Sequence, residues 1–80
     1  MPKELEQDGF RFYIYYNDHT PSHVHVKKAG MEVIINLGDE STKPYVRENR
    51  RMSFRDMIKA LEIAARERKR LERSWRRIHG

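Results

Sequence analysis

The feature that most constrains the fold is a change in the spacing of apolar residues along the chain. In segments between residues 10 and 46, apolar side chains recur at every second position, whereas from residue 53 to residue 79 they recur at every third or fourth. The first spacing gives a strand one apolar face, and the second gives a helix one apolar stripe. Together they predict an α+β fold, in which a three- or four-stranded antiparallel sheet packs against one long C-terminal amphipathic helix.

Three segments of the first half have the composition of strands, namely residues 10–16, 23–28 and 31–37. Because Ala29-Gly30 is the only connection between the second and the third, these two are predicted to form a tight antiparallel hairpin. Residues 44–46 are a candidate fourth strand at the edge, and residues 1–9 are predicted to be a lead-in. The side chains expected to face the core from these strands are Phe10, Phe12, Ile14, Tyr16, Val24, Val26, Met31, Val33, Ile35 and Leu37.

The helix is predicted to begin after Ser53 and to run close to His79. Ser53 suits the N-cap position, and Asp56 three residues later approximates a capping box. The apolar stripe ends in Leu71, Trp75 and Ile78. We expect Trp75 to close the core, although a tryptophan among arginines is also typical of an anchor for a partner.

Length and composition limit the class of protein. Eighty residues make one domain, residues 1–80, and the absence of cysteine excludes disulfides and thiolate zinc sites. No apolar run is long enough to span a bilayer, and the first residues lack the apolar region of a secretory signal. The sequence therefore predicts a soluble, cytoplasmic protein with no membrane partner.

The positive charge of the chain is concentrated at its C-terminal end. Residues 66–80 hold seven basic and two acidic side chains, which accounts for the whole net charge of +5. Such a patch attracts nucleic-acid phosphates or an acidic partner, while the alternative is a solvated helix end whose cations favour the negative end of the helix dipole. The candidate binding residues are Arg66, Arg68, Lys69, Arg70, Arg73, Arg76 and Arg77, together with Tyr13 and Tyr15 on the strand face opposite the core.

The candidate catalytic residues lie in a compact histidine cluster between Asn17 and His25. His23 and His25 are two positions apart on a predicted strand, so their rings project from the same face. His19 lies in the loop that enters this strand, and Asp18 adds a carboxylate to the same turn. The predicted catalytic residues are therefore His19, His23, His25 and Asp18.

Three interpretations of this cluster stay open. Two histidines with a third histidine or Asp18 could ligate a metal ion with one position free, although the spacing is not one of the well-defined metal signatures. Alternatively, one imidazole could take a proton and another give one without a metal, as cleavage of RNA at a 2′-hydroxyl requires. The third interpretation is structural, with the histidines bonding backbone carbonyls to fix a turn.

The run from Tyr15 to Val26 resembles the signature of a small bacterial family known as domain of unknown function 4160, roughly F-x-N-D-H-x-P-P-H-F-H-V. Leu71 and Trp75 match the late Leu-x-x-x-Trp of that family, so the resemblance spans about residues 10 to 78. Two positions depart from the pattern: Ser22 stands where a second proline is usual, and Val24 where phenylalanine is usual. The stretch from Asp39 to Arg51 is also more polar than is typical of the family. The motif positions that match are Asn17, Asp18, His19, Pro21, His23, His25 and Val26.

The resemblance implies a small bacterial or phage protein, commonly encoded beside a second small protein and suspected of being a toxin-antitoxin component. It implies no catalytic mechanism. We therefore expect a toxin-like component of a two-gene module that binds or cleaves RNA, uses no cofactor or metal, and partners RNA or a small antitoxin-like protein. The alternative is a non-enzymatic protein that docks on a larger protein or nucleoprotein complex through its basic helix and tyrosine face.

Overall fold

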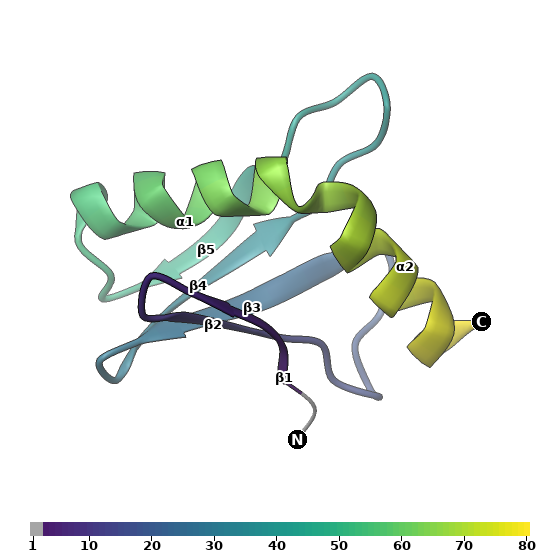
Figure 1. The fold of residues 1–80 in the computed structure, drawn as a ribbon, viewed down its shortest axis with the longest axis horizontal. Helices are drawn as coiled ribbons and strands as arrows, with labels where there is room; N and C mark the ends of the chain where they lie inside the picture. The colour runs from purple at the N-terminus through teal and green to yellow at the C-terminus, as the bar shows by residue number, and fades with distance from the viewer. Residues whose placement is uncertain (1–2) are drawn as a thin grey trace.

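A computed structural model describes residues 3–80 as a five-stranded antiparallel sheet with two helices (Figure 1). The strands are paired in chain order, β1-β2-β3-β4-β5, so every strand lies beside its neighbours in sequence. The α+β class and the antiparallel sheet are confirmed, but the sheet has five strands rather than three or four, and the expected single helix is two. The elements are β1 (Lys3–Gln7), β2 (Phe10–Tyr13), β3 (His23–Lys28), β4 (Met31–Asn36), β5 (Tyr45–Arg50), α1 (Phe54–Arg66) and α2 (Arg68–His79).

Two tight turns set the register of β1 with β2 and of β3 with β4. Asp8-Gly9 joins β1 to β2 and Ala29-Gly30 joins β3 to β4, and φ is positive at all four residues. Two-residue hairpin turns with positive φ at both positions match the right-handed twist of the strands. The predicted β3–β4 hairpin is thus confirmed, whereas the prediction of a lead-in over residues 1–9 is wrong from Lys3 to Gln7. The polar sequence of that segment conceals a strand.

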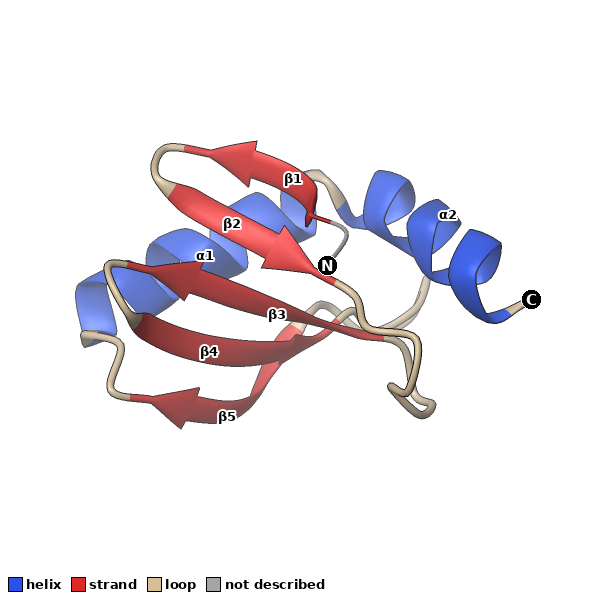
Figure 2. Cartoon of the chain, turned by 90° about the horizontal axis from the view of Figure 1, so that it is seen from below, coloured by secondary structure: helices blue, strands red, loops and turns tan. Residues whose placement is uncertain are grey.

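Helix α1 lies across one face of the sheet and α2 continues past the end of the sheet, while neither helix covers the other face (Figure 2). The core between the layers is one cluster that extends from Leu5 on β1 to Trp75 on α2. Trp75 is 6% exposed, so it belongs to the core as expected. Of the described helices, neither is long and apolar enough to cross a membrane.

The first predicted strand ends three residues early, at Tyr13. Ile14 is still fully buried, but Tyr16, which was predicted to face the core, is 79% exposed. The chain leaves the sheet here because the Asp18 amide donates a hydrogen bond to the Tyr15 carbonyl, which closes a turn. The alternation of side chains therefore stops where the turn begins.

The helical segment begins as predicted and then divides. Ser53 is the N-cap of α1, and its Oγ accepts a hydrogen bond of 3.1 Å from the Asp56 amide. At Glu67 the backbone leaves helical geometry, with φ −102° and ψ 16°. Figure 1 shows the consequence: α1 lies along the sheet, whereas α2 turns away toward the end where β2 is joined to β3.

Candidate functional site

The loop between β2 and β3 holds Asp18 in a fixed position. Its amide donates to the Tyr15 carbonyl at 3.1 Å, and its Oδ2 accepts a hydrogen bond of 2.9 Å from the Tyr15 amide. These two bonds orient the carboxylate and leave Oδ1 for other partners. Asparagine and aspartate commonly close turns in this way.

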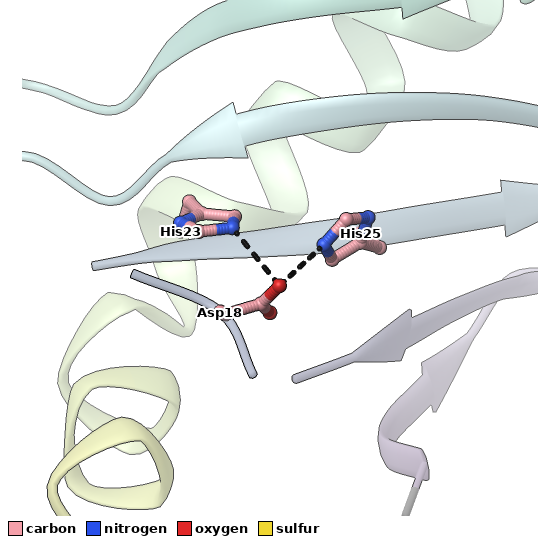
Figure 3. Close-up of side chains that lie close together, drawn as sticks. All are labelled: Asp18, His23 and His25. Atoms are coloured by element: carbon pink, nitrogen blue, oxygen red, sulfur yellow. Dashed lines mark hydrogen bonds and ion pairs between the residues drawn. The ribbon is translucent and has the colours of Figure 1, made fainter. Parts of the chain in front are cut away.

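His23 and His25, at alternate positions of β3, converge on that oxygen (Figure 3). His25 Nε2 lies 3.2 Å and His23 Nε2 lies 3.5 Å from Asp18 Oδ1. The structure therefore brings together three of the four predicted catalytic residues. His19 is exposed in the loop and lies outside this group.

The Nδ1 atom of each ring has a hydrogen-bond partner of its own. His23 Nδ1 lies 3.0 Å from the Pro21 carbonyl oxygen, and His25 Nδ1 lies 2.9 Å from Glu32 Oε2. Both partners accept hydrogen bonds, so each Nδ1 carries a proton and donates it. All four ring nitrogens of the pair are thus engaged.

Glu32 is a site residue that the sequence reasoning missed. Its position follows from the β3–β4 hairpin, in which Glu32 pairs with Lys27 and Ile34 pairs with His25. Glu32 is thus the diagonal neighbour of His25 on the same face, close enough for a long side chain to reach. The Ala29-Gly30 turn was the signal that could have revealed it.

Burial shapes the charge of the cluster. His23 is 4% exposed, and burial lowers the pKa of its ring, although the Pro21 carbonyl works in the opposite direction. Burial alone would raise the pKa of Asp18, but the Tyr15 amide and the two imidazoles outweigh it and bring that pKa below its usual value. The site therefore favours an ionised carboxylate next to a neutral His23.

A continuous series of ring contacts connects the cluster with Tyr13 of β2 on one side and with Trp75 of α2 on the other. Tyr15 lies 4.6 Å from His25, His25 lies 5.3 Å from His23, and His23 lies 5.2 Å from Trp75, all between ring centroids. Beyond Tyr15, the ring of Tyr13 is stacked nearly parallel at 6.2 Å. The predicted tyrosine face and α2 thus both border the cluster.

One polar contact also fastens the loop to α2. Ser22 Oγ donates a hydrogen bond of 3.0 Å to Glu72 Oε1, fifty positions further along the chain. Ser22 is the residue that replaces a proline of the family pattern. The departure therefore supplies a donor that a proline side chain could not.

The predicted basic residues line the outside of the helices. Six are exposed, and Arg68 is half-buried. In the part of the chain that the structure describes, Arg77 is the one member of this set with a carboxylate within 4.0 Å, Glu4 Oε1 at 2.7 Å. One groove between α2 and the loop around Asp39 is lined by Arg68, Lys69, Arg73 and Arg76, together with the carboxylates of Asp39, Glu40 and Glu72.

The comparisons with known proteins identify a family and no function. The family model described as "Domain of unknown function (DUF4160)" matches residues 9–76, which include the loop, the cluster and most of α2. No curated protein and no solved structure matches the chain.

Proposed function

The chain belongs to the DUF4160 family, and from this premise we propose that it is a toxin-like, RNA-binding component of a two-gene bacterial or phage module. The observation that carries the RNA-binding part is the row of exposed cations along α2, most of which have no carboxylate partner in residues 3–80. Cations that are not neutralised within the protein are available to phosphates.

The spacing of these cations suits an extended phosphate chain. Lys69, Arg73, Arg76 and Arg77 follow one another at intervals of four, three and one. Residues three or four apart share a helix face, so Lys69, Arg73 and Arg76 form a row of about 10.5 Å at 1.5 Å per residue, with Arg77 beside it. Seven cations in fifteen residues also exceed what the dipole of a helix end attracts.

The stacked tyrosines supply a second element of the binding surface. Tyr13 and Tyr15 lie nearly parallel, and Lys27 Nζ lies 5.4 Å and 5.9 Å from their ring centroids. Aromatic rings beside cations bind single strands because bases stack on the rings while phosphates contact the charges. This combination favours a single-stranded nucleic acid, and RNA is the one proposed here.

Binding is better supported than cleavage. An imidazole that transfers a proton to or from RNA needs a nitrogen that faces the substrate. In His23 and His25 both nitrogens are engaged by Asp18, Glu32 or the Pro21 carbonyl. Proton transfer at the cluster stays a hypothesis, which the binding experiment also tests because cut RNA is visible on a gel.

The experiment is filter binding of a short radiolabelled single-stranded RNA over a series of salt concentrations. Each phosphate contact contributes roughly 0.7 to the slope of log affinity against log salt. We expect the double variant Lys69→Gln/Arg73→Gln to reduce that slope by about 1.4, and to weaken binding roughly 10- to 30-fold at 0.1 M salt.

A matched variant separates α2 from charge in general. Arg55 and Lys59 have the same spacing of four on α1, at the opposite end of the helical layer (Figure 1). The variant Arg55→Gln/Lys59→Gln is expected to keep the slope of the parent. Equal losses in both double variants, or no binding by the parent chain, would contradict the proposal.

The toxin-like role is tested by growth. Induced expression in a bacterial host is expected to arrest growth with the parent chain and not with Lys69→Gln/Arg73→Gln at equal protein levels. Equal growth of the two strains would show that RNA binding by α2 is not the source of toxicity. If binding were insensitive to salt and required a protein partner, the docking alternative would replace the RNA proposal.

A further inference from the structure

The protons on the two imidazoles leave the centre of the cluster short of hydrogen-bond donors. The proton on His23 Nδ1 is donated to the Pro21 carbonyl, and the proton on His25 Nδ1 is donated to Glu32. A neutral imidazole has only one proton, so both Nε2 atoms carry lone pairs. Both Nε2 atoms lie within 3.5 Å of Asp18 Oδ1, which is itself an acceptor when ionised.

Three acceptors that face one another need a positive charge between them. A second proton on His23 would place a charge on a ring that is only 4% exposed. A second proton on His25, which lies between Asp18 and Glu32, would satisfy Asp18 but leave His23 Nε2 facing Asp18 Oδ1 without a proton between them. A metal cation satisfies all three acceptors at once. Histidines that bind metals typically donate the other ring N–H to a carboxylate or a backbone carbonyl, as Glu32 and Pro21 provide here.

The distances suit a transition metal of the size of zinc. Ligands that lie 2.0 to 2.1 Å from a tetrahedral zinc ion are about 3.4 Å from one another. The two separations from Asp18 Oδ1 to the imidazole nitrogens are 3.2 Å and 3.5 Å, and the ligand atoms of the three residues all lie within 4.8 Å. Two imidazoles and one carboxylate form a donor set that zinc and its neighbours prefer and magnesium does not.

We propose that Asp18, His23 and His25 bind a divalent transition-metal ion, with zinc as the first candidate. Three protein ligands leave one tetrahedral position for water or for a ligand from outside. The side chains of Asp18 and His25 are 11% and 13% exposed, so the cluster keeps some contact with solvent. Glu32 is a positioning residue, because it orients His25 without contacting the ion.

The test uses an untagged protein of residues 1–80, freed of metal with EDTA and titrated calorimetrically with Zn²⁺ and, in a separate arm, with Mg²⁺. We expect one equivalent of Zn²⁺ to bind with micromolar or tighter affinity, and Mg²⁺ not to bind in the same range. Asp18→Asn and His25→Gln are expected to abolish the zinc signal while circular dichroism stays that of the parent. Glu32→Gln is expected to bind roughly 10- to 100-fold more weakly at unchanged stoichiometry.

His19→Ala is the matched control. It removes an exposed histidine one position from Asp18 that lies outside the group, so its zinc affinity is expected to equal that of the parent. An affinity reduced as much as in His25→Gln would show that zinc binds to surface histidines, and the proposal would fail. Absence of binding by the parent chain would overturn it as well.

A measurement on the parent chain avoids any question of whether variants fold. In long-range ¹H–¹⁵N spectra of the four histidines, zinc is expected to shift Nε2 of His23 and His25 and to leave His19 and His79 unchanged. Shifts at any other pair would overturn the assignment. No RNA is present in these experiments, so their result is independent of the proposed function.

Discussion

At the scale of single residues, the cluster is ordered by groups that are not themselves histidines. The Tyr15 amide fixes Asp18, the Pro21 carbonyl fixes His23, and Glu32 fixes His25. Each of these partners binds one polar atom of a site residue, so that the second polar atom of the same side chain is left at the centre of the cluster. The site is therefore set by the loop and by β4 as much as by β3.

Ser22 gives the first prediction. Its hydroxyl is the donor for Glu72, and both side chains are partly buried. Ser22→Ala leaves the Glu72 oxygen without this donor, so we expect a loss of about 1 to 2 kcal/mol in the free energy of unfolding. Urea denaturation measures it, with the exposed Ser41→Ala as a control expected to stay within about 0.5 kcal/mol of the parent. Equal values for the two variants would mean that the contact with α2 contributes nothing.

Tyr13 gives the second. Stacking of one base on an aromatic ring contributes about 1 to 3 kcal/mol, so Tyr13→Ala is expected to weaken RNA binding by at least about fivefold. The dependence on salt should not change, because no phosphate contact is removed. Tyr16, which is 79% exposed and predicted from the sequence to be buried, provides the control. If Tyr16→Ala weakens binding as much as Tyr13→Ala, the stacked pair is not the platform.

The residues of the cluster could be predicted to a large extent. Asp18, His23 and His25 follow from the phase of one strand and the loop before it. His19 could not be placed, because a loop residue has no periodicity to fix the direction of its side chain. Glu32 required the register of a hairpin, which the strand pattern alone does not give.

At the scale of elements, the hairpin of β3 and β4 was predictable and the helix break was not. Ala29-Gly30 identifies the turn, and alternation identifies both strands. Glu67 is neither glycine nor proline, and the hydrogen bonds from the Glu67 amide to Ile63 and from the Leu71 amide to Glu67 continue on both sides of it. The change of direction comes from tertiary packing, since α1 covers the sheet and α2 covers the loop at its end.

The third prediction concerns α2 as a structural element. Leu71 is fully buried in the same core as the residues of the sheet, whereas Leu61 on α1 is half-buried. Leu71→Ala is therefore expected to cost about 2 to 5 kcal/mol of folding free energy, and Leu61→Ala clearly less. Chemical denaturation followed by circular dichroism compares them. A Leu71 variant as stable as the parent would make α2 an appendage rather than part of the fold.

At the scale of the whole molecule, the sheet uses its two faces differently. One face packs against α1 (Figure 2). The opposite face carries His25 and the tyrosine pair, and His23 beside them contacts Trp75 of α2. A two-layer domain must bury one apolar face, but nothing obliges it to cover the second. The alternation of valines and histidines predicts the two faces of β3, whereas the polar sequence of β1 does not identify that segment as a strand.

The fourth prediction is that residues 1–80 unfold as one domain. The core is a single cluster that extends from β1 to α2, so no element has apolar contacts of its own to retain. For 80 residues we expect a calorimetric enthalpy of about 55 kcal/mol near 60 °C, equal to the van't Hoff enthalpy. Scanning calorimetry of the EDTA-treated protein measures both. A van't Hoff value well below the calorimetric one would show that α2 or β1 melts separately.

The contact between His23 and Trp75 has a practical consequence. Trp75 is the only tryptophan of the chain, and its ring centroid lies 5.2 Å from that of His23. Indole emission responds to charge and quenchers at such short range. The intrinsic fluorescence of the purified, unlabelled protein therefore reports on the interior of the cluster, and events there can be followed in real time and at low concentration.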